Sequence, residues 1–510
     1  MNSKERLILA SVIALVILLR LPSLADPMYY LDEGVYASVA YEMGEGGMLY
    51  QTAWDLKPPG IFLIYLFFQK LFGPQAFLAQ KIFNTLLAVS TVFGIFKLAR
   101  LQGVTERGSV TPFIATGFGA VYLGLPFFET QVFNTESIFV VISLFAFVFG
   151  LKFRGRWKEP FIAGLLFGVG QWLKIHPIFD LASFVIFAAY KFRFDKKFWL
   201  PFIAGLATPL AGLFLYLTAN GILADFIETN FSYNLFYVEE LPQIKIFGNL
   251  LTRTLLLLTA TVALVFLKLK NKISENTLLL FLWLAFVFYG ALLSARAYGH
   301  YFIPVLIPTA LLLATMVGKP ARSGTVPDLV VTTALALLPF VGYTLLQTPV
   351  RAETLQQEIF SNQIYFYQHR LSYLRGKINQ REFEKDFTPK PWRLRELKTY
   401  LDNNVSKNEQ VYIWGISPWA NYVLERRPAQ KYLMWFHVLG VGNREEEVYQ
   451  DLLSKMPEII IVEDNQPEGE SYPISRPPFF ELQALIDTSY QFETTIAGYK
   501  IYKKITLAVQ

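Results

Sequence analysis

The stretch "LDEGVYASVAYEMGEGGMLYQTAWDLKPPG", residues 31–60, lies between two apolar runs and resembles neither of them. Its acidic residues are Asp32, Glu33, Glu42, Glu45 and Asp55. A glycine cluster interrupts it, and it ends with a lysine followed by two prolines and a glycine, at residues 57–60. So many carboxylates in an apolar setting need either a structural or a chemical explanation. The surrounding sequence indicates where this stretch lies relative to the membrane.

The composition of the chain is that of a membrane protein. Of its 510 residues, 53% are hydrophobic and 17% are charged, whereas about 25% of the residues of an ordinary soluble protein are charged. Cysteine is absent, which excludes disulfides, a thiolate nucleophile and a cysteine-ligated metal. Any part of the chain outside the membrane must therefore be stable through packing alone.

Apolar runs predict a mostly α-helical, polytopic membrane protein with about eleven transmembrane helices. Several runs are shorter than the ~20 residues of a full crossing, which indicates helices that end inside a cavity or a locally thin membrane. The predicted spans are 7–24, 76–99, 111–127, 137–151, 160–174, 177–190, 199–219, 249–267, 277–294, 301–317 and 327–346.

The charge of the connecting loops predicts the orientation of these spans. Alternate loops carry 18 Lys and Arg, and the loops of the other set carry few, among them Lys57, Lys174, Lys245 and Arg296. Because excess Lys and Arg marks the cytoplasmic side, we expect a cytoplasmic N-terminus and an extracytoplasmic C-terminal region in a cell (inner) membrane. Topology also explains the net charge of +6, so no nucleic-acid partner is expected.

The long apolar runs stop near residue 346, and we expect two domains, a transmembrane domain at 1–346 and an extracytoplasmic α/β domain at 347–510. Segments 409–415 and 458–464 have the composition of short strands, 496–505 of a strand or hairpin arm, and 444–456 has helical spacing with an acidic first turn. No nucleophile elbow, phosphate-binding loop or dinucleotide motif is found there. This region is therefore predicted to be an accessory domain.

Asp32 and Glu33 are the first candidates for chemistry. "DEGVYASVAYEM" predicts a short helix that ends at the glycines beginning with Gly44, and Asp32 fits its N-cap. A simple capping role is thus one explanation for Asp32. The other is that a carboxylate just outside the membrane acts as a general base, with its neighbour orienting a substrate or a metal.

Lys57 is the second candidate. Prolines suit the first turn of a helix, so Lys57 lies just before the predicted helix that begins "GIFLIYLFFQKLFG". One explanation is a lysine that extends its ammonium to the membrane surface. The alternative is a phosphate site, because the free N–H groups at a helix start and a cation favour the same anion.

Further candidates lie in the later outer loops. Glu136 in "FNTES" opens the fourth span, where helix-start chemistry alone could explain it, and Lys174 in "QWLKIHP" lies between two short spans. Arg296, Tyr298 and His300 belong to "RAYGHYF". Ionisable residues at such places are functional hypotheses by default, and an arginine with a histidine can hold a phosphate.

"DEGVYASVAYEM", "DLKPPG" and the "LFG" that closes the next helix resemble membrane glycosyltransferases of the C-type (GT-C) fold. The resemblance is to the bacterial group related to 4-amino-4-deoxy-arabinose transferases and protein O-mannosyltransferases. "NTES", "LKIHP" and "RAYGHYFIPVLIP" fall where that group has acidic, Lys-Pro and His-Tyr-Pro signatures. The resemblance covers residues 1–346 and extends to the C-terminal region in position and type only.

This resemblance implies a transferase that moves a sugar from a polyprenyl-phosphate donor to an extracytoplasmic acceptor, which is a lipid, a glycan or a protein hydroxyl. It implies that Asp32 is the catalytic base, with Glu33 contributing to the site, and that Lys57 meets the lipid phosphate. Lys174, Arg296 and His300 match the donor-phosphate side. Glu136 matches the acidic residue at the start of the fourth span, and we expect it and Tyr298 at the substrate.

In such a reaction the acceptor hydroxyl attacks the anomeric carbon directly, so the configuration at that carbon inverts. Some relatives bind a divalent metal near the first-loop carboxylates, which leaves a metal cofactor open, but no metal ligand is assigned here. The competing functions are a polysaccharide polymerase or ligase that uses lipid-linked sugars, and a transporter of such lipids. A transporter is expected to show an internal repeat and midplane charges, and neither is found in the sequence.

Overall fold

The computed structural model describes residues 2–102, 110–235, 250–294, 296, 298–317, 326–346, 356–387, 391–464 and 478–505. The chain divides into two compact units. We call Met1–Leu24, Gln80–Leu223 and Asn230–Gln368 the helical unit, and Ala25–Ala79, Ala224–Thr229 and His369–Gln510 the mixed unit.

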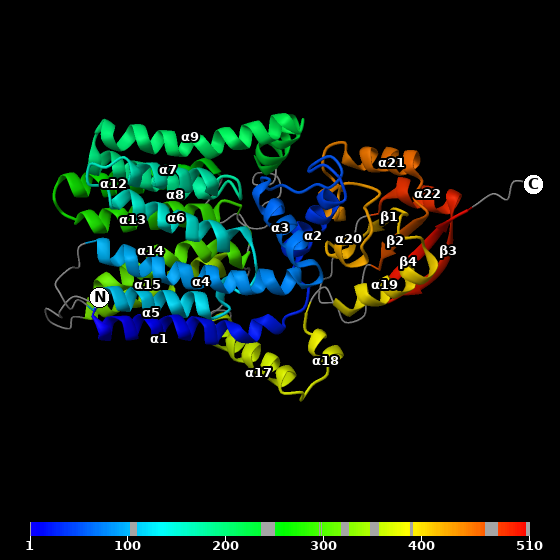
Figure 1. The fold of residues 1–510 in the computed structure, drawn as a ribbon, viewed down its shortest axis with the longest axis horizontal. Coiled ribbons are helices and arrows are strands. Elements are labelled where there is room, and N and C mark those ends of the chain that lie inside the picture. The colour runs from blue at the N-terminus through cyan, green and yellow to red at the C-terminus, as the bar shows by residue number, and fades with distance from the viewer. Residues whose placement is uncertain are drawn as a thin grey trace, which may run out of the picture. The chain divides into compact units, whose positions relative to one another are not determined.

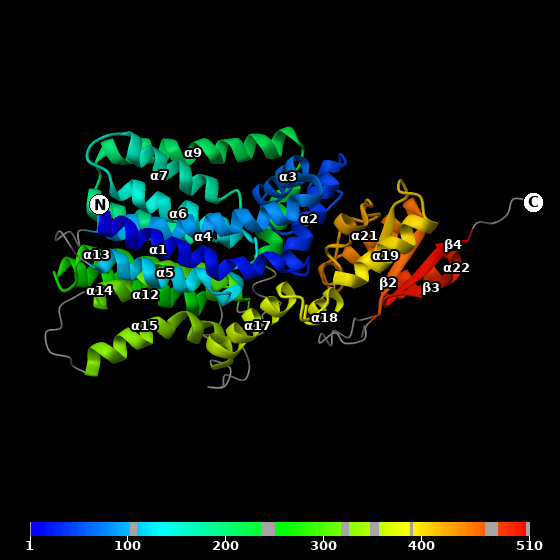
Figure 2. The same ribbon diagram turned by 60° about the horizontal axis from the view of Figure 1, so that its bottom comes forward.

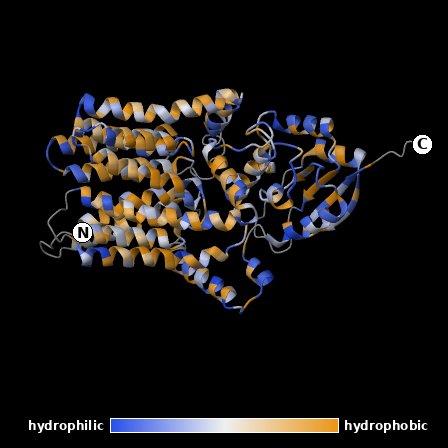
Figure 3. Cartoon of the chain, viewed as in Figure 1, coloured by the Kyte–Doolittle hydropathy of each residue, from blue (hydrophilic) through white to orange (hydrophobic). Residues whose placement is uncertain are grey.

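Each predicted span coincides with a helix in the described residues (Figures 1 and 2). These helices are α1 (Ser3–Arg20), α4 (Ala76–Leu101), α5 (Thr111–Gly124), α6 (Thr135–Leu151), α7 (Lys158–Gly170), α8 (Pro177–Phe192), α9 (Lys196–Ala219), α12 (Leu250–Leu269), α13 (Glu275–Leu292), α14 (Ile303–Val317) and α15 (Val326–Leu345). Apolar residues run along most of their lengths (Figure 3). Among the described residues, six helical segments are long and apolar enough to cross a membrane, and the mostly α, polytopic membrane architecture is confirmed.

Glycines set the closest helix contact in the helical unit, between α7 and α9. A Cβ added at Gly164 would lie 2.0 Å from the carbonyl oxygen of Phe202, and one at Gly205 would lie 2.0 Å from that of Phe161. Both helices therefore bring their backbones together through glycine, as membrane helices do when small residues face each other.

The mixed unit holds a four-stranded sheet in the order β1-β2-β4-β3. The strands are β1 (Val411–Trp414), β2 (Ile459–Glu463), β3 (Tyr490–Ile496) and β4 (Tyr499–Lys504). β1 and β2 are parallel, whereas β4 runs antiparallel to both β2 and β3. The parallel pair needs a crossover connection, and the predicted helix at 444–456 supplies it as α21 (Arg444–Lys455). The α/β character predicted for the C-terminal region is confirmed.

The remaining helices complete the two units. They are α2 (Leu31–Gly44), α3 (Gly60–Phe72), α10 (Leu223–Ile227), α17 (Asn362–Leu374), α18 (Gln380–Glu384), α19 (Pro391–Asn404), α20 (Ala420–Leu424) and α22 (Phe480–Ser489). The mixed unit thus contains the connection between the first two predicted spans, residues 25–79, together with residues 224–229 and 369–510. The domain boundary predicted at residue 346 stays a prediction.

One face of α2 packs against the segment around α20. The Trp419 indole N–H donates to the carbonyl oxygen of Tyr30 at 2.9 Å, and the Ser38 hydroxyl donates to the carbonyl oxygen of Pro418 at 2.5 Å. Gly34 lies on the same face, and a Cβ there would come within 2.6 Å of the Trp419 ring and 2.9 Å of its backbone nitrogen. The glycine of "DEGVY" is therefore the position at which the tryptophan approaches the helix.

We predict that Gly34→Ala destabilises the protein. The added methyl group must displace a buried tryptophan and its backbone, and overpacking of this kind costs about 1–3 kcal/mol. Thermal unfolding of the detergent-purified protein should show a clearly lower Tm. Gly117→Ala, in α5, is the matched control, because a Cβ there meets nothing within 4 Å. Equal melting temperatures for Gly34→Ala and wild type would contradict the packing of Trp419 against α2.

Candidate functional site

Asp32 and Glu33 both lie in the first turn of α2. The helix begins at Leu31 after an extended Tyr30 (φ −69°, ψ 129°), which is the N-cap and makes no side-chain capping bond. The prediction that Asp32 is the N-cap is therefore wrong, because Leu31 already has helical geometry and moves Asp32 inside the helix. Glu33 is buried and Asp32 is half-buried. Capping no longer explains Asp32, and a carboxylate in the first turn is favoured by the helix dipole.

Lys57 is buried rather than extended into solvent. Its Nζ lies 3.3 Å from Oδ1 of Asp55 and 5.0 Å from the centroid of the Tyr36 ring. The Tyr50 hydroxyl donates to the carbonyl oxygen of Lys57 at 2.8 Å, which fixes the backbone just before α3. A lysine that reaches for the membrane surface would place its ammonium among water and lipid head groups. The ammonium of Lys57 instead faces a carboxylate and an aromatic ring of its own unit.

Asp32, Asp55 and Lys57 interact electrostatically. We call these three residues and Glu33 the first-loop cluster. Burial raises the pKa of Asp55, the ammonium of Lys57 lowers it, and the negative charge of Asp32 raises it again. Asp32 is thus close enough to Asp55 for the two carboxylates to repel. The ammonium of Lys57 neutralises only part of the negative charge of Asp55 and Asp32. Lys57 can pair with a further anion, such as a phosphate, when one of these carboxylates is protonated or moves away.

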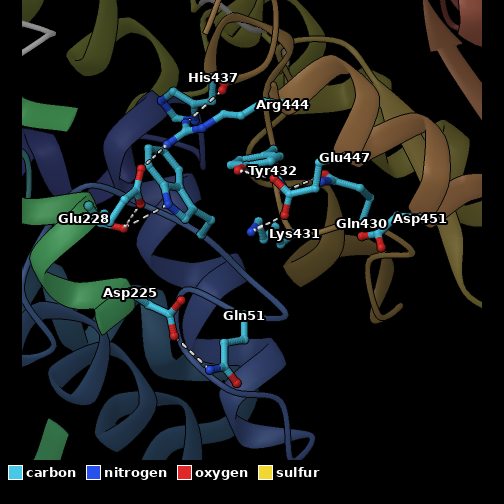
Figure 4. A network of polar contacts seen from close by, with 12 residues as sticks. Gln51, Asp225, Glu228, Gln430, Lys431, Tyr432, His437, Arg444, Glu447 and Asp451 are labelled. Atoms are coloured by element: carbon cyan, nitrogen blue, oxygen red, sulfur yellow. Dashed lines mark hydrogen bonds and ion pairs between the residues drawn. The ribbon is translucent and has the colours of Figure 1, made fainter. Parts of the chain in front are cut away.

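Residues of the C-terminal region, among them Arg444 and His437 (Figure 4), contact the segment next to this cluster. The guanidinium of Arg444 lies 4.2 Å from the ring centroid of Trp54 and 4.7 Å from that of Tyr432. Arg444 also donates to the carbonyl oxygen of His437 at 2.9 Å and pairs with Glu228 at 3.4 Å. The Trp54 backbone N–H donates to the carbonyl oxygen of Lys431 at 2.9 Å. Trp54 is adjacent to Asp55, so these contacts fix the position from which Asp55 meets Lys57.

His437 is a candidate that the sequence did not indicate. Its ring lies 5.0 Å from that of Trp54, and the residue is buried. Burial lowers the pKa of His437 to about 3, with Arg444 and Lys57 acting in the same direction and Asp32 opposing them. His437 is therefore a neutral imidazole close to the first-loop cluster. No local signal surrounds it, because its place depends on how residues 428–444 fold back on residues 50–57.

In the helical unit, Glu136 and Lys174 form a buried ion pair. α6 is capped by Asn134, whose side chain accepts from the Thr135 N–H at 2.7 Å, and the Thr135 hydroxyl donates to Glu136 at 2.7 Å. The ammonium of Lys174 also lies 4.2 Å from the ring centroid of Tyr301. Asn134 thus caps the helix, and the Thr135 hydroxyl and the Lys174 ammonium fix the position of the Glu136 carboxylate.

His300 belongs to the same helical unit and contacts a different carboxylate. Its Nδ1 lies 2.8 Å from Oε2 of Glu129, which also accepts from the His300 backbone N–H at 3.1 Å. Gly299 permits the approach, because a Cβ there would lie 3.1 Å from Cα of Phe128. Tyr298 stacks on the His300 ring at 5.8 Å and is partly exposed, whereas Arg296 is buried.

The predicted site residues thus form two groups, each within its own unit. Asp32, Glu33 and Lys57 belong to the mixed unit; Glu136, Lys174, Arg296, Tyr298 and His300 belong to the helical unit. Their roles stay predictions. Within the part of the chain that the structure describes, no three His, Asp or Glu side chains are grouped so that they could hold a metal ion.

We predict that the Glu136–Lys174 pair is stabilising only as a pair. Glu136→Gln leaves the buried Lys174 without this counter-ion, and breaking a buried pair in this way costs about 3–5 kcal/mol. The double variant Glu136→Gln/Lys174→Met should recover most of that loss. The exposed pair of Lys191 and Glu275, 2.8 Å apart, is the control, since Glu275→Gln should cost less than ~1 kcal/mol. Similar losses of Tm at both pairs would contradict the burial of Glu136.

Comparison with known proteins places the fold. No protein-family model and no curated protein matches the sequence. The crystal structure of ArnT from Cupriavidus metallidurans bound to undecaprenyl phosphate is similar over 99% of both chains, with a TM-score of 0.61 and 12% sequence identity. The Archaeoglobus fulgidus oligosaccharyltransferase AglB, in complex with an inhibitory peptide and a dolichol-phosphate, matches 99% of this chain and 75% of its own, with a TM-score of 0.48 and 11% identity. The protein therefore has the C-type glycosyltransferase fold that its first outer loop predicted.

Proposed function

We propose that this protein is an integral-membrane glycosyltransferase that transfers a sugar from a polyprenyl-phosphate donor to a hydroxyl of an extracytoplasmic acceptor. The observation that carries the proposal is the first-loop cluster, in which the half-buried Asp32 and the buried Lys57 at the start of α3 both act on the buried Asp55. The similar ArnT structure is described as bound to undecaprenyl phosphate, which supports a donor of this chemical class.

In the proposed reaction, Asp32 accepts the proton of the acceptor hydroxyl as its oxygen bonds to the anomeric carbon. The bond from that carbon to the phosphate oxygen breaks, and its electron pair leaves with the polyprenyl phosphate. Attack from the side opposite the phosphate, with no enzyme nucleophile, inverts the anomeric carbon. Glu33 contributes to the site beside Asp32.

Lys57 stabilises the phosphate as negative charge develops on it. Asp55 acts through Lys57 as a positioning residue, because its carboxylate is 3.3 Å from the ammonium. Arg296, His300 and Lys174 are assigned to the donor phosphate, and Glu136 and Tyr298 to the substrate, on the resemblance alone. The carboxylate of Glu136 opposes the charge of Lys174, as that of Asp55 opposes the charge of Lys57.

The proposal includes the orientation that the loop charges predict, in which the site lies outside the cytoplasm. The membrane is a cell (inner) membrane, and the C-terminal region is on the same side as the site. An alkaline phosphatase fused after residue 505 should be active in intact cells. An inactive phosphatase there, together with an active cytoplasmic reporter, contradicts the orientation.

For Asp32, we predict that Asp32→Asn lowers kcat by about 10²- to 10⁴-fold, the usual loss when a general base is removed. The amide keeps the shape of the side chain and α2 keeps its Tyr30 cap, so expression and Tm should stay near those of wild type. Asp464→Asn is the control, because Asp464 pairs with Lys500 at the sheet, 3.1 Å away and exposed. Turnover of a polyprenyl-phosphate sugar within about threefold of wild type, at equal Tm, removes Asp32 from the role of base.

For Lys57, we predict that Lys57→Ala weakens donor binding and slows turnover together, while the acceptor KM barely changes. The charge acts on the donor phosphate both when it binds and as the sugar leaves. Lys57→Arg should rescue only in part, since a planar guanidinium does not replace a compact ammonium. Lys500→Ala is the matched control. Donor KM and kcat equal to those of wild type in Lys57→Ala would show that the phosphate binds elsewhere.

A further inference from the structure

A groove of about 810 Å³ lies in the mixed unit beside the C-terminal ends of α2 and α3. Tyr41 and Glu45 at the end of α2, and Gln69 at the end of α3, contribute to one wall. Residues of α17 to α20, among them Tyr373 and Tyr422, contribute to the other. None of these residues belongs to the first-loop cluster. The volume is that of an ordinary small-molecule site, which spans roughly 300–1,000 Å³.

Aromatic side chains in this groove are held in place from behind. The Tyr373 ring stacks on the buried Phe383, with centroids 4.3 Å apart and planes at 2°. Phe77, also in the lining, packs edge-on against Trp419 with centroids 5.4 Å apart. Because their orientation is fixed before a ligand binds, these rings offer apolar faces at a low cost in conformational entropy.

Three of the four described carboxylates that line the groove pair with a cation, and the Lys70 ammonium donates to the carbonyl oxygen of Gly44. Asp26 lies 2.7 Å from Arg370, Glu384 lies 2.5 Å from Arg395, and Glu425 lies 3.1 Å from Lys398. At these three carboxylates, a charged ligand would have to displace the existing partner and would gain little net Coulomb energy. A neutral ligand can instead use the same carboxylate, amide and hydroxyl groups as hydrogen-bond donors and acceptors without breaking an ion pair.

Sugar rings have this combination of properties, with apolar C–H faces and a rim of neutral hydroxyls. We propose that the groove binds neutral sugar units of the acceptor, so that the acceptor is a glycan or carries one. This inference rests on the proposed transferase function and specifies that its acceptor contains neutral sugar units. The Tyr41 and Tyr373 rings pack on sugar faces, while Glu45 and Gln69 contact hydroxyls.

The part of the groove around Tyr41 is remote from the reacting hydroxyl. Tyr41 follows Asp32 by nine residues on α2, which is about 14 Å along the helix axis. The sugar units held there are therefore not the one that attacks the donor. Their contacts are the same before and during the reaction, so the loss of one should raise the acceptor KM and leave kcat unchanged.

Direct binding tests the proposal on the full-length purified protein. The probes are neutral oligosaccharides, from di- to hexasaccharides of glucose, mannose, galactose and N-acetylglucosamine, titrated calorimetrically beside basic and acidic peptides. We expect binding of at least one neutral oligosaccharide and none of the peptides. Tyr373→Ala should weaken that binding at least about tenfold, and Glu45→Gln should weaken it to a lesser degree.

The control for lost aromatic surface is Phe492→Ala. Phe492 is exposed and pairs with Tyr502 at the sheet edge, 5.7 Å away and outside the groove. It should bind the oligosaccharide as wild type does. The proposal is overturned if no oligosaccharide binds, if a peptide binds in preference, or if Tyr373→Ala binds as tightly as Phe492→Ala.

The same preparation separates this inference from the proposed function. Turnover of a polyprenyl-phosphate sugar, with oligosaccharide binding that Tyr373→Ala does not affect, supports the transferase and overturns the groove. Oligosaccharide binding that depends on Tyr373, without any donor turnover, supports the groove as a glycan site and overturns the transferase. Where both hold, Tyr373→Ala should raise the acceptor KM at constant kcat.

Discussion

The contact between α2 and the segment around α20 determines how the acidic first loop is presented. Gly34, Ser38 and Glu42 are spaced four residues apart and so share one helix face. They meet Trp419, the carbonyl of Pro418 and the guanidinium of Arg427, the last through two bonds of 3.0 and 2.5 Å. With that face covered, the first turn of α2 has a fixed direction. The position of Asp32 within the cluster therefore depends on these contacts of α2, which are made by residues outside the cluster.

The predicted spans could be found from sequence because the signal of an apolar run is local. Each apolar run became a helix, and the loop signature indicated the fold with no recourse to distant contacts. The N-cap of α2 was placed two residues too late, since Leu31 and Tyr30 give no capping signal and an aspartate does. Boundaries of this kind depend on backbone geometry that side-chain preference only biases.

The candidate site was predicted less fully, for a physical reason. Asp32, Glu33 and Lys57 lie within one loop, and their common purpose can be inferred from their proximity in sequence. The partners that define their environment come from elsewhere: Arg444 packs on Trp54, and His437 lies beside them both. Pairings over hundreds of residues leave no trace in the composition of a single segment. Likewise, nothing in "NTES" or "LKIHP" states that Glu136 and Lys174 meet.

The separation between α2 and its partner has a consequence for biogenesis. The hydrogen bond from Trp419 to Tyr30 joins positions 389 residues apart. At about 5–20 residues per second, the ribosome needs roughly 20–80 s to reach Trp419 after Tyr30 has been made. During that interval the acidic loop exists without the surface that covers α2. The newly made protein therefore completes the packing of α2 only after Trp419 and Arg427 have been translated, which delays assembly of the candidate site until then.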